Sequence, residues 1–103
     1  MEGNANIINS LEEWSEIFGS QDEKYDKKFF GKNSLIVYGS MRSTQGTEMD
    51  VAKIQKNKNE LLVELNVRPG YMDALGGYTI NIEVKKSDMK NINSLRIVEI
   101  LEN

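Results

Sequence analysis

The sequence predicts an α+β fold, with one or two N-terminal helices packed on a five-stranded, mostly antiparallel sheet. Apolar residues recur at helical spacing near the N-terminus, whereas apolar and polar residues alternate from residue 34 onward. The links between the alternating segments leave little room for a crossover helix, which favours antiparallel pairing. We expect the sheet to curl into a small sandwich or an open barrel.

The first helix is predicted over residues 11–18. Ser10 and Glu13 have the S-x-x-E form of a capping box, in which the two side chains satisfy free backbone N–H groups. Gly19 suits the left-handed position after the last turn. The apolar face of this helix consists of Leu11, Trp14, Ile17 and Phe18.

A second, short helix is predicted after a highly charged stretch. Asp26 is placed to cap it, Phe29 and Phe30 lie inside it, and Gly31 ends it. Tyr25 and Phe29 are four residues apart and would share one face.

Five strands are predicted from the alternating pattern. In the second we expect Met49 and Val51 on the core side, with Ile54 as a third candidate. In the last, Glu99 would face inward on one of the two phases, so we expect Val98 and Ile100 on the core side. The predicted segments are 34–41, 47–55, 60–67, 77–86 and 94–101.

The links carry turn signals. Residues 56–59 form a compact turn whose asparagines tolerate a left-handed backbone. Residues 68–77 form a longer loop around the only proline. Residues 87–94 are either a loop or one helical turn capped by Ser87.

Length and composition set the class and exclude several functions. A chain of 103 residues predicts one domain, which we assign to residues 10–103 after a flexible N-terminus at 1–9. The net charge of −3 disfavours nucleic-acid binding. The late cluster Lys85, Lys86, Lys90 and Arg96 is interleaved with carboxylates, which favours a solvated face over a binding patch.

Cysteine and histidine are both absent. Their absence removes disulfides, zinc–thiolate sites and the usual Ser-His-Asp and Cys-His catalytic sets. No apolar run is long enough to span a bilayer, and no signal peptide opens the chain, so we expect a soluble protein. Its compartment stays open, because a removed signal or lipoprotein anchor remains an alternative. We expect no catalytic residue, cofactor or metal, and either a monomer or a homodimer.

Two loops supply the candidate interaction residues, which are Arg42, Thr44, Tyr71 and Met72. The stretch 39–47 lacks the lysine, the glycine spacing and the following helix of a P-loop, which favours a connecting loop over an anion site. The large groups of the 68–77 loop either fold over the end of the sheet or face a partner protein, and we favour burial of some of them.

The chain from Leu35 to Val84 resembles the C-terminal domain of the PrcB type, found in subunits of bacterial protease complexes and in bacterial envelope proteins. The residues that carry this resemblance are Gly39, Thr44, Gly46, Val51 and Ile54, then the "ELLVEL" strand, Pro69 with Gly70, and the "YTINIEV" strand. Gln45 and Thr47 depart from the glycine and the tyrosine of that pattern. The resemblance implies a noncatalytic, envelope-associated module that contacts another protein, and it carries over no catalytic residue.

Three functions remain open at this stage. The first is an uncharacterised noncatalytic bacterial protein-interaction module. The second is a small ligand-binding protein or enzyme that uses carboxylates and the 39–47 loop around Arg42. The third is a structural domain that pairs edge strands into a homodimer.

Overall fold

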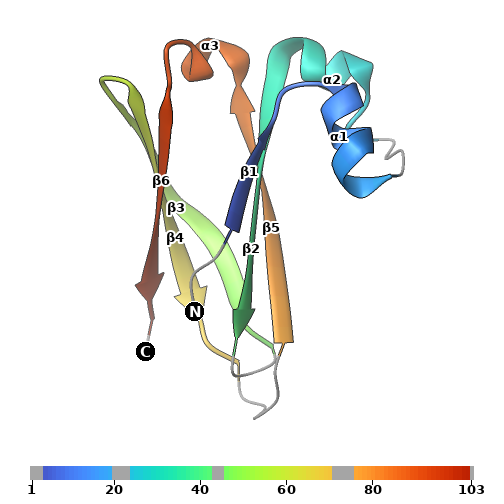
Figure 1. Cartoon of the computed structure of the whole chain (residues 1–103). Helices are drawn as coiled ribbons and strands as arrows, with labels where there is room; N and C mark the ends of the chain where they lie inside the picture. The colour runs from blue at the N-terminus through green and yellow to red at the C-terminus, as the bar shows by residue number, and fades with distance from the viewer. Residues whose placement is uncertain (1–3, 20–23, 43–45, 71–75, 103) are drawn as a thin grey trace.

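The computed structural model describes residues 4–19, 24–42, 46–70 and 76–102. Six strands and three short helices occupy these residues (Figure 1). The elements in chain order are β1 (Asn4–Ile8), α1 (Leu11–Phe18), α2 (Lys27–Lys32), β2 (Asn33–Arg42), β3 (Glu48–Asn57), β4 (Glu60–Arg68), β5 (Gly76–Lys85), α3 (Lys86–Met89) and β6 (Ser94–Leu101).

Both predicted N-terminal helices form with the N-caps expected, but Gly31 does not end α2, which continues to Lys32 and has Asn33 as its C-cap. Ser10 Oγ accepts the backbone N–H of Glu13 at 3.1 Å, and the Glu13 carboxylate accepts the N–H of Asn9. Gly19 takes the left-handed conformation after the last turn, with φ of 64°. Asp26 caps α2 by accepting the N–H of Phe29 at 2.8 Å. Local sequence therefore defines these ends.

The α+β class is confirmed, but the single five-stranded sheet is wrong. The strands form two three-stranded sheets, in the orders β1-β2-β5 and β3-β4-β6. The additional strand is β1, which pairs antiparallel with β2 from Asn4 opposite Gly39 to Ile8 opposite Leu35. Residues 4–8 were expected to belong to a flexible N-terminus. The sequence pattern did not indicate this strand, because its first three residues are "NAN" and an edge strand needs few apolar residues.

The pairing is mostly antiparallel, as expected, and one pair of strands among the described residues is parallel. β4 and β6 run side by side with Leu61 opposite Leu95 and Val67 opposite Leu101. The chain leaves β4, passes through β5 in the other sheet, and returns through α3 to β6 (Figure 1). The crossover thus uses a strand of the opposite sheet in place of a long helix, which the link lengths alone could not reveal.

The two sheets share one core, and β2 is buried on both faces. Its side chains Ile36 and Tyr38 join the inter-sheet core, whereas Leu35 and Val37 join a second cluster on the helix side. Burial on both faces explains the uninterrupted apolar run in β2. The inter-sheet core is formed by Ile36, Tyr38, Met49, Leu61, Val63, Leu65, Val67, Ile82 and Val84. The helix-side cluster is formed by Ile8, Trp14, Tyr25, Phe30, Leu35 and Val37.

The phase of β6 is the opposite of the one expected. Leu95 and Ile97 pack against the inter-sheet core, while Ile100 is 40% exposed. Glu99 lies on the inward phase, and its carboxylate accepts a hydrogen bond from the hydroxyl of Tyr38. The expectation failed because it assumed that an inward carboxylate would have no donor.

Two links also differ in detail. The last link contains a helical turn, as one alternative predicted, but α3 begins at Lys86 and has no side-chain cap, so Ser87 does not cap it. In the β3–β4 turn the residue with a left-handed backbone is Lys58, with φ of 57°, in place of an asparagine. Asn93 and Ser94 both donate backbone N–H groups to the carbonyl of Asn59, which fixes this turn beside the start of β6.

Candidate functional site

The two sheets separate along the edge where β3 faces β5. The strands approach near the start of β3, where the hydroxyl of Tyr78 donates to the carbonyl of Met49 at 3.2 Å. Further along β3, the register with β4 shifts between Val51 and Lys53. A bulge bends its strand and increases the twist, so β3 turns away from β5 beyond this point. The β3–β5 opening, defined by Val51, Ile54, Leu61 and Val84, results from this bend.

Core-facing side chains are exposed in the β3–β5 opening. Met49 is buried as expected, but Val51 is 39% and Ile54 is 41% exposed. The expected inward positions of Val51 and Ile54 therefore do not give burial. A pocket of about 460 Å³ lies here, lined by Ile54, Lys56, Leu61, Glu83, Val84, Lys85 and Asp88.

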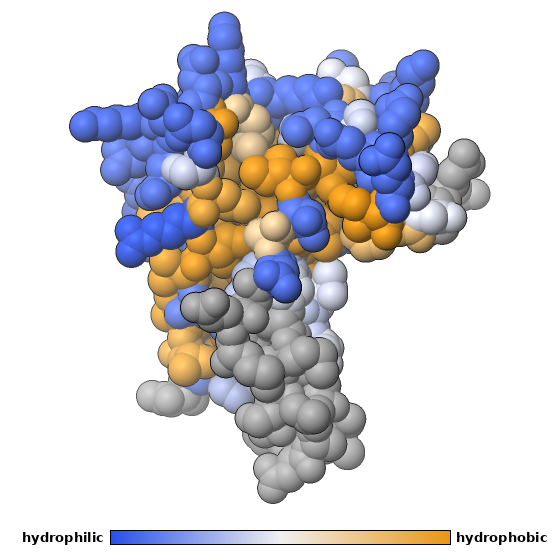
Figure 2. All heavy atoms as spheres, in the orientation of Figure 1, coloured by the Kyte–Doolittle hydropathy of each residue, from blue (hydrophilic) through white to orange (hydrophobic). Residues whose placement is uncertain are grey.

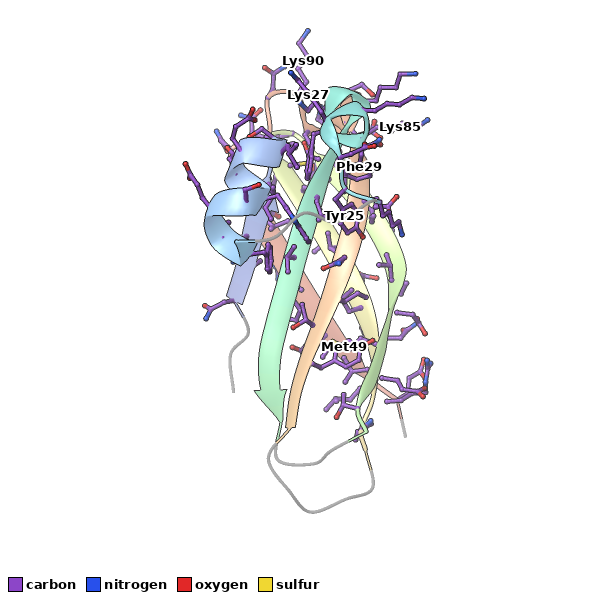
Figure 3. The ribbon with its side chains drawn as sticks, turned by 90° about the vertical axis from the view of Figure 1, so that its right-hand side faces the viewer. Tyr25, Lys27, Phe29, Met49, Lys85 and Lys90 are labelled. Atoms are coloured by element: carbon purple, nitrogen blue, oxygen red, sulfur yellow. The ribbon has the colours of Figure 1, made fainter. Side chains whose placement is uncertain are left out.

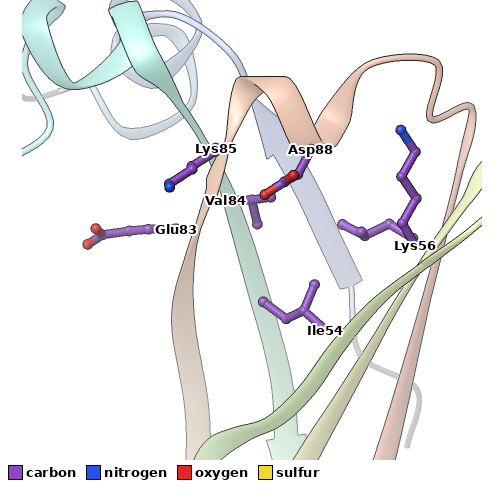
Figure 4. A pocket seen from close by; sticks show the side chains of 7 residues that line it. Ile54, Lys56, Glu83, Val84, Lys85 and Asp88 are labelled. Carbon is purple, nitrogen blue, oxygen red and sulfur yellow. The ribbon is translucent and has the colours of Figure 1, made fainter.

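Figure 4 shows how the walls of this pocket are arranged. Ile54 and Val84 face each other across the opening, and Asp88 of α3 lies above them. Glu83 and Lys85 project from the other side of β5, as the alternation of a strand requires. The floor is apolar and the rim carries charges of both signs.

The outer edge of β5 is a long, regular strand edge. β5 is the last strand of its sheet, and it pairs with β2 over ten consecutive positions without a register shift, from Asn33 opposite Lys85 to Arg42 opposite Gly76. Its backbone groups on the side of the opening therefore have no sheet partner among the described residues. Such an edge is a template for a further strand.

Lysines gather at the end of the molecule where α2, α3 and the β3–β4 turn lie. Three stretches of sequence meet here, which are α2, the segment around α3 and the end of β3. Asn33, directly after α2, pairs with Lys85, directly before α3. Lys56 Nζ of β3 donates a hydrogen bond to the carbonyl of Lys90, directly after α3, at 2.9 Å. Figure 3 shows Lys27, Lys85 and Lys90 at the same end. We define the lysine-rich end as Lys27, Lys28, Lys32, Lys56, Lys58, Lys85, Lys86 and Lys90, all exposed.

The expectation of a mixed solvated face captured only part of this end. It includes Lys85, Lys86 and Lys90, which lie at this end, and Arg96, which lies on β6. It does not include the lysines of α2 and of the β3–β4 turn. A signal was present in the sequence, since each of the three segments places lysines at a predicted element end. The meeting of the three segments depends on strand pairing.

At the opposite end of β4, cationic and acidic groups are paired. Arg68 lies within 2.9 Å of Asp50, 3.3 Å of Glu102 and 3.4 Å of Glu48. Hydrogen bonds from Asn66 and then from Arg68 hold the pKa of Asp50 below its ordinary value. The hydrogen bonds from Arg68 to Asp50, Glu102 and Glu48 raise the pKa of its guanidinium. The arginine here is thus fully engaged.

A second apolar surface lies along the other open edge of the sandwich. Figure 2 shows apolar groups between β6 and β1, with hydrophilic groups above them. Ile7 of β1 is 38% exposed, and Leu101 at the end of β6 is 67% exposed. A pocket of about 500 Å³ opens near the upper end of this edge, lined by Asn9, Ser34, Lys86, Ser87, Met89 and Lys90.

The residues predicted from sequence as an interaction surface are only partly described. The backbone of Arg42 ends β2 opposite Gly76, at the end of the molecule away from α3. Thr44, Tyr71 and Met72 lie outside the described residues. Gly46 and Gly70, which flank the two loops, lie close together: a Cβ added to Gly46 would be 3.8 Å from the Cα of Gly70. The two loops therefore start from the same end of the sandwich.

The described residues hold no group of three or more Asp or Glu side chains able to bind a metal ion. No helix in this part of the chain has the length and apolar content needed to cross a membrane. Trp14 Nε1 is buried and has no acceptor among the described residues. Its ring packs on Phe18 and Tyr25 at centroid distances of 4.3 and 5.1 Å.

Comparisons with protein-family models, with curated proteins and with solved structures found no match. The resemblance to the PrcB-type domain therefore stays a prediction.

Proposed function

We propose that the protein is a noncatalytic protein-interaction module that binds an extended segment of a partner protein in the β3–β5 opening. The observation that carries this proposal is the 41% exposure of Ile54, a core-facing side chain opposite Val84. Exposed apolar groups beside a strand edge are typical of sites where a peptide adds a strand.

The partner segment pairs with the outer edge of β5. The backbone of β5 supplies the hydrogen bonds, and alternate side chains of the added strand cover Val51, Ile54 and Val84. The bulge in β3 makes β3 the poorer template, because its register breaks between Val51 and Lys53. The added strand can run either parallel or antiparallel to β5, because the antiparallel pairing of β5 with β2 does not fix the direction of a strand on its other edge.

The charges around the opening indicate which segment fits. Lys56 and Lys85 on the rim are balanced by Glu83 and Asp88. The best segment is therefore uncharged in its centre, with apolar side chains at every second position. Such a segment places one apolar row in the pocket and its polar row in solvent.

The PrcB-type resemblance adds a proposed setting. If it holds, the partner is another protein of a bacterial envelope complex. The loop-based alternative, a ligand-binding protein or enzyme using residues 39–47, rests on a loop whose residues 43–45 lie outside the described ranges. The homodimer alternative uses the same edge, with a second β5 as the added strand.

Selection of peptides followed by NMR mapping tests the proposal. Peptides are selected from a random library displayed on phage, and the tightest binder is titrated into the isotopically labelled protein. We expect the largest amide shifts along β5 and around Ile54. Shifts that concentrate on the outer face of β6, or an absence of any selected binder, would contradict the proposal.

Two variants make the test specific. Ile54→Asn removes apolar surface from the opening, and Ile100→Asn removes it from the outer face of β6, where Ile100 is equally exposed at 40%. We expect Ile54→Asn to weaken peptide binding about tenfold, from the lost burial of one side chain, and Ile100→Asn to leave it unchanged. Light scattering tests the homodimer alternative. If the protein is a dimer and Ile54→Asn dissociates it, the segment bound in the opening belongs to a second copy of the chain.

A further inference from the structure

We propose that the lysine-rich end is a contact surface for anionic lipid membranes. This proposal does not depend on the β3–β5 opening having a partner, although Lys56 and Lys85 belong both to the rim of that opening and to the lysine-rich end. It rests on the placement of eight exposed lysines, on the absence of a carboxylate near their ammonium groups among the described residues, and on the net positive charge of this end.

The ammonium groups of this end form no ion pair with the residues that the structure describes. Among the described residues, none of the eight lysines has a carboxylate within 4 Å, whereas Lys24 pairs with Glu83 at 2.9 Å and Arg68 contacts three carboxylates. Within the described ranges, the one polar contact of these ammonium groups is the hydrogen bond from Lys56 to the carbonyl of Lys90. Lys24 and Arg68 are thus paired with carboxylates, whereas the ammonium groups of the lysine-rich end are available to an external anion.

The lysine-rich end has a net positive charge in a chain that is negative overall. Eight lysines and four carboxylates lie in residues 26–32, 56–60 and 83–90, which together have a net charge of +4. Because the whole chain has a net charge of −3, the remaining residues have a net charge of −7. The nine residues of β4 place Glu60 and Arg68 roughly 27 Å apart. At physiological salt the Debye length is about 8 Å, so an anionic surface at the lysine-rich end interacts little with the carboxylates around Arg68.

A hollow at this end suits a lipid headgroup. The pocket of about 500 Å³ between the end of β1 and α3 has Lys86 and Lys90 in its wall, together with the polar side chains of Asn9 and Ser87. A headgroup phosphate here would meet two ammonium groups and hydrogen-bond donors. The adjacent helix α1 carries glutamates at 12, 13 and 16, which restricts the contact to the side of α2, α3 and the β3–β4 turn.

The composition of this end favours lipid over nucleic acid. Readout or stacking on nucleic acid uses arginine and exposed rings. The described residues of the lysine-rich end include no arginine, and Phe29 and Phe30 of α2 pack into or against the helix-side cluster. Lysine is a point charge on a flexible stem and suits a surface of many mobile phosphates. Polybasic lysine groups bind anionic leaflets with about a fivefold gain in affinity per lysine.

Co-sedimentation with vesicles tests this proposal. The full chain is mixed with vesicles of phosphatidylcholine alone or of phosphatidylcholine with phosphatidylglycerol. We expect binding only to the vesicles that contain phosphatidylglycerol, and loss of binding near 1 M salt, where the Debye length is about 3 Å. Millimolar inorganic phosphate should displace the protein no more than sodium chloride of equal ionic strength, because a free phosphate engages one site and a membrane engages many.

Matched double variants identify the surface. K86Q/K90Q removes two lysines at the headgroup pocket, K27Q/K28Q removes two from α2, and K53Q/R96Q removes the same charge from the outer face of the β3-β4-β6 sheet. We expect each lysine-end pair to weaken vesicle binding roughly 30-fold and the control pair to change it less than threefold. Circular dichroism verifies that all three remain folded.

Three outcomes would overturn the proposal. The first is an absence of binding to phosphatidylglycerol vesicles even at low salt. The second is an equal loss of binding in K53Q/R96Q and in the lysine-end pairs, which would indicate a response to net charge alone. The third is tighter binding to a DNA duplex than to vesicles at the same ionic strength, which would assign the end to nucleic acid.

Discussion

The hydroxyl of Tyr38 in β2 donates a hydrogen bond to the carboxylate of Glu99 in β6, across the core that the two sheets share. Tyr38 is 6% exposed, and Glu99 lies on the inward phase of its strand. This contact joins the central strand of one sheet to an edge strand of the other. It also explains how β6 can place a carboxylate on its core side.

Tyr38→Phe should destabilise the fold by about 1–2 kcal/mol, because a half-buried carboxylate loses a hydrogen-bond donor. Urea unfolding followed by the fluorescence of Trp14 measures this change. The double variant Y38F/E99L should recover at least half of the loss, because it removes the carboxylate together with its donor. If the double variant is as unstable as the sum of the two single variants, the two residues are not coupled.

Trp14→Phe should change the free energy of unfolding by less than about 1.5 kcal/mol, whereas Trp14→Ala should cost about 3–5 kcal/mol. The indole N–H is buried and has no acceptor among the described residues, so its removal relieves a polar cost while the ring contacts with Phe18 and Tyr25 persist. Thermal unfolding followed by circular dichroism compares the two variants. A large loss in Trp14→Phe would show that the N–H has an acceptor.

Lys58→Gly should stabilise the protein by about 0.5–1 kcal/mol. Lys58 holds a φ of 57°, a conformation that costs an L-residue about 1–2 kcal/mol and glycine very little, and the greater entropy of glycine in the unfolded chain offsets part of the gain. The control is Asn57→Gly, one residue earlier, where φ is negative and a loss of stability is expected. The midpoints of urea unfolding show whether each variant is more or less stable than the original protein.

The carboxyl of Asp50 should titrate below its ordinary pKa of 3.8, because Asn66 and then Arg68 donate hydrogen bonds to it. Its folded-state pKa is lower than its unfolded-state pKa. Its contribution to stability is therefore present above about pH 3.8 and is lost as the pH falls through the folded-state pKa. NMR titration of the side-chain carboxyl measures this value, and Asn66→Ala should move it toward 3.8. An unchanged value in that variant would assign the shift to Arg68 alone.

Much of the local structure could be predicted from the sequence, and the reasons are local. The capping groups of Ser10 and Asp26 define both N-terminal helices within one turn, and the alternation of β4 predicts its inward row, from Leu61 to Val67. A strand of mainly polar residues such as β1 carries no such signal. Strand pairing uses the same backbone groups in every strand, so the division into two sheets and the parallel β4–β6 pair could not be read from the pattern.

The candidate site depended still more on the tertiary structure. The inward position of Ile54 could be suggested from its spacing, but its exposure comes from the bulge in β3 and the distance to Val84 in the other sheet. The interaction residues chosen from sequence were loop residues, and the surfaces that carry the two proposals lie elsewhere. Each of these surfaces combines residues that are distant in the chain.

The sequence by itself determined the α+β class, the ends of most helices and strands, and the absence of cysteine and histidine chemistry, because propensity, capping and composition act within a few residues. Only the tertiary structure decided which faces stay exposed and which charges stay unpaired. Lys27, Lys56 and Lys86 share one end of the molecule because the pairing of β2 with β5 and the contact of Lys56 with Lys90, directly after α3, bring their segments together. That convergence is a property of strand pairing, which no local pattern encodes.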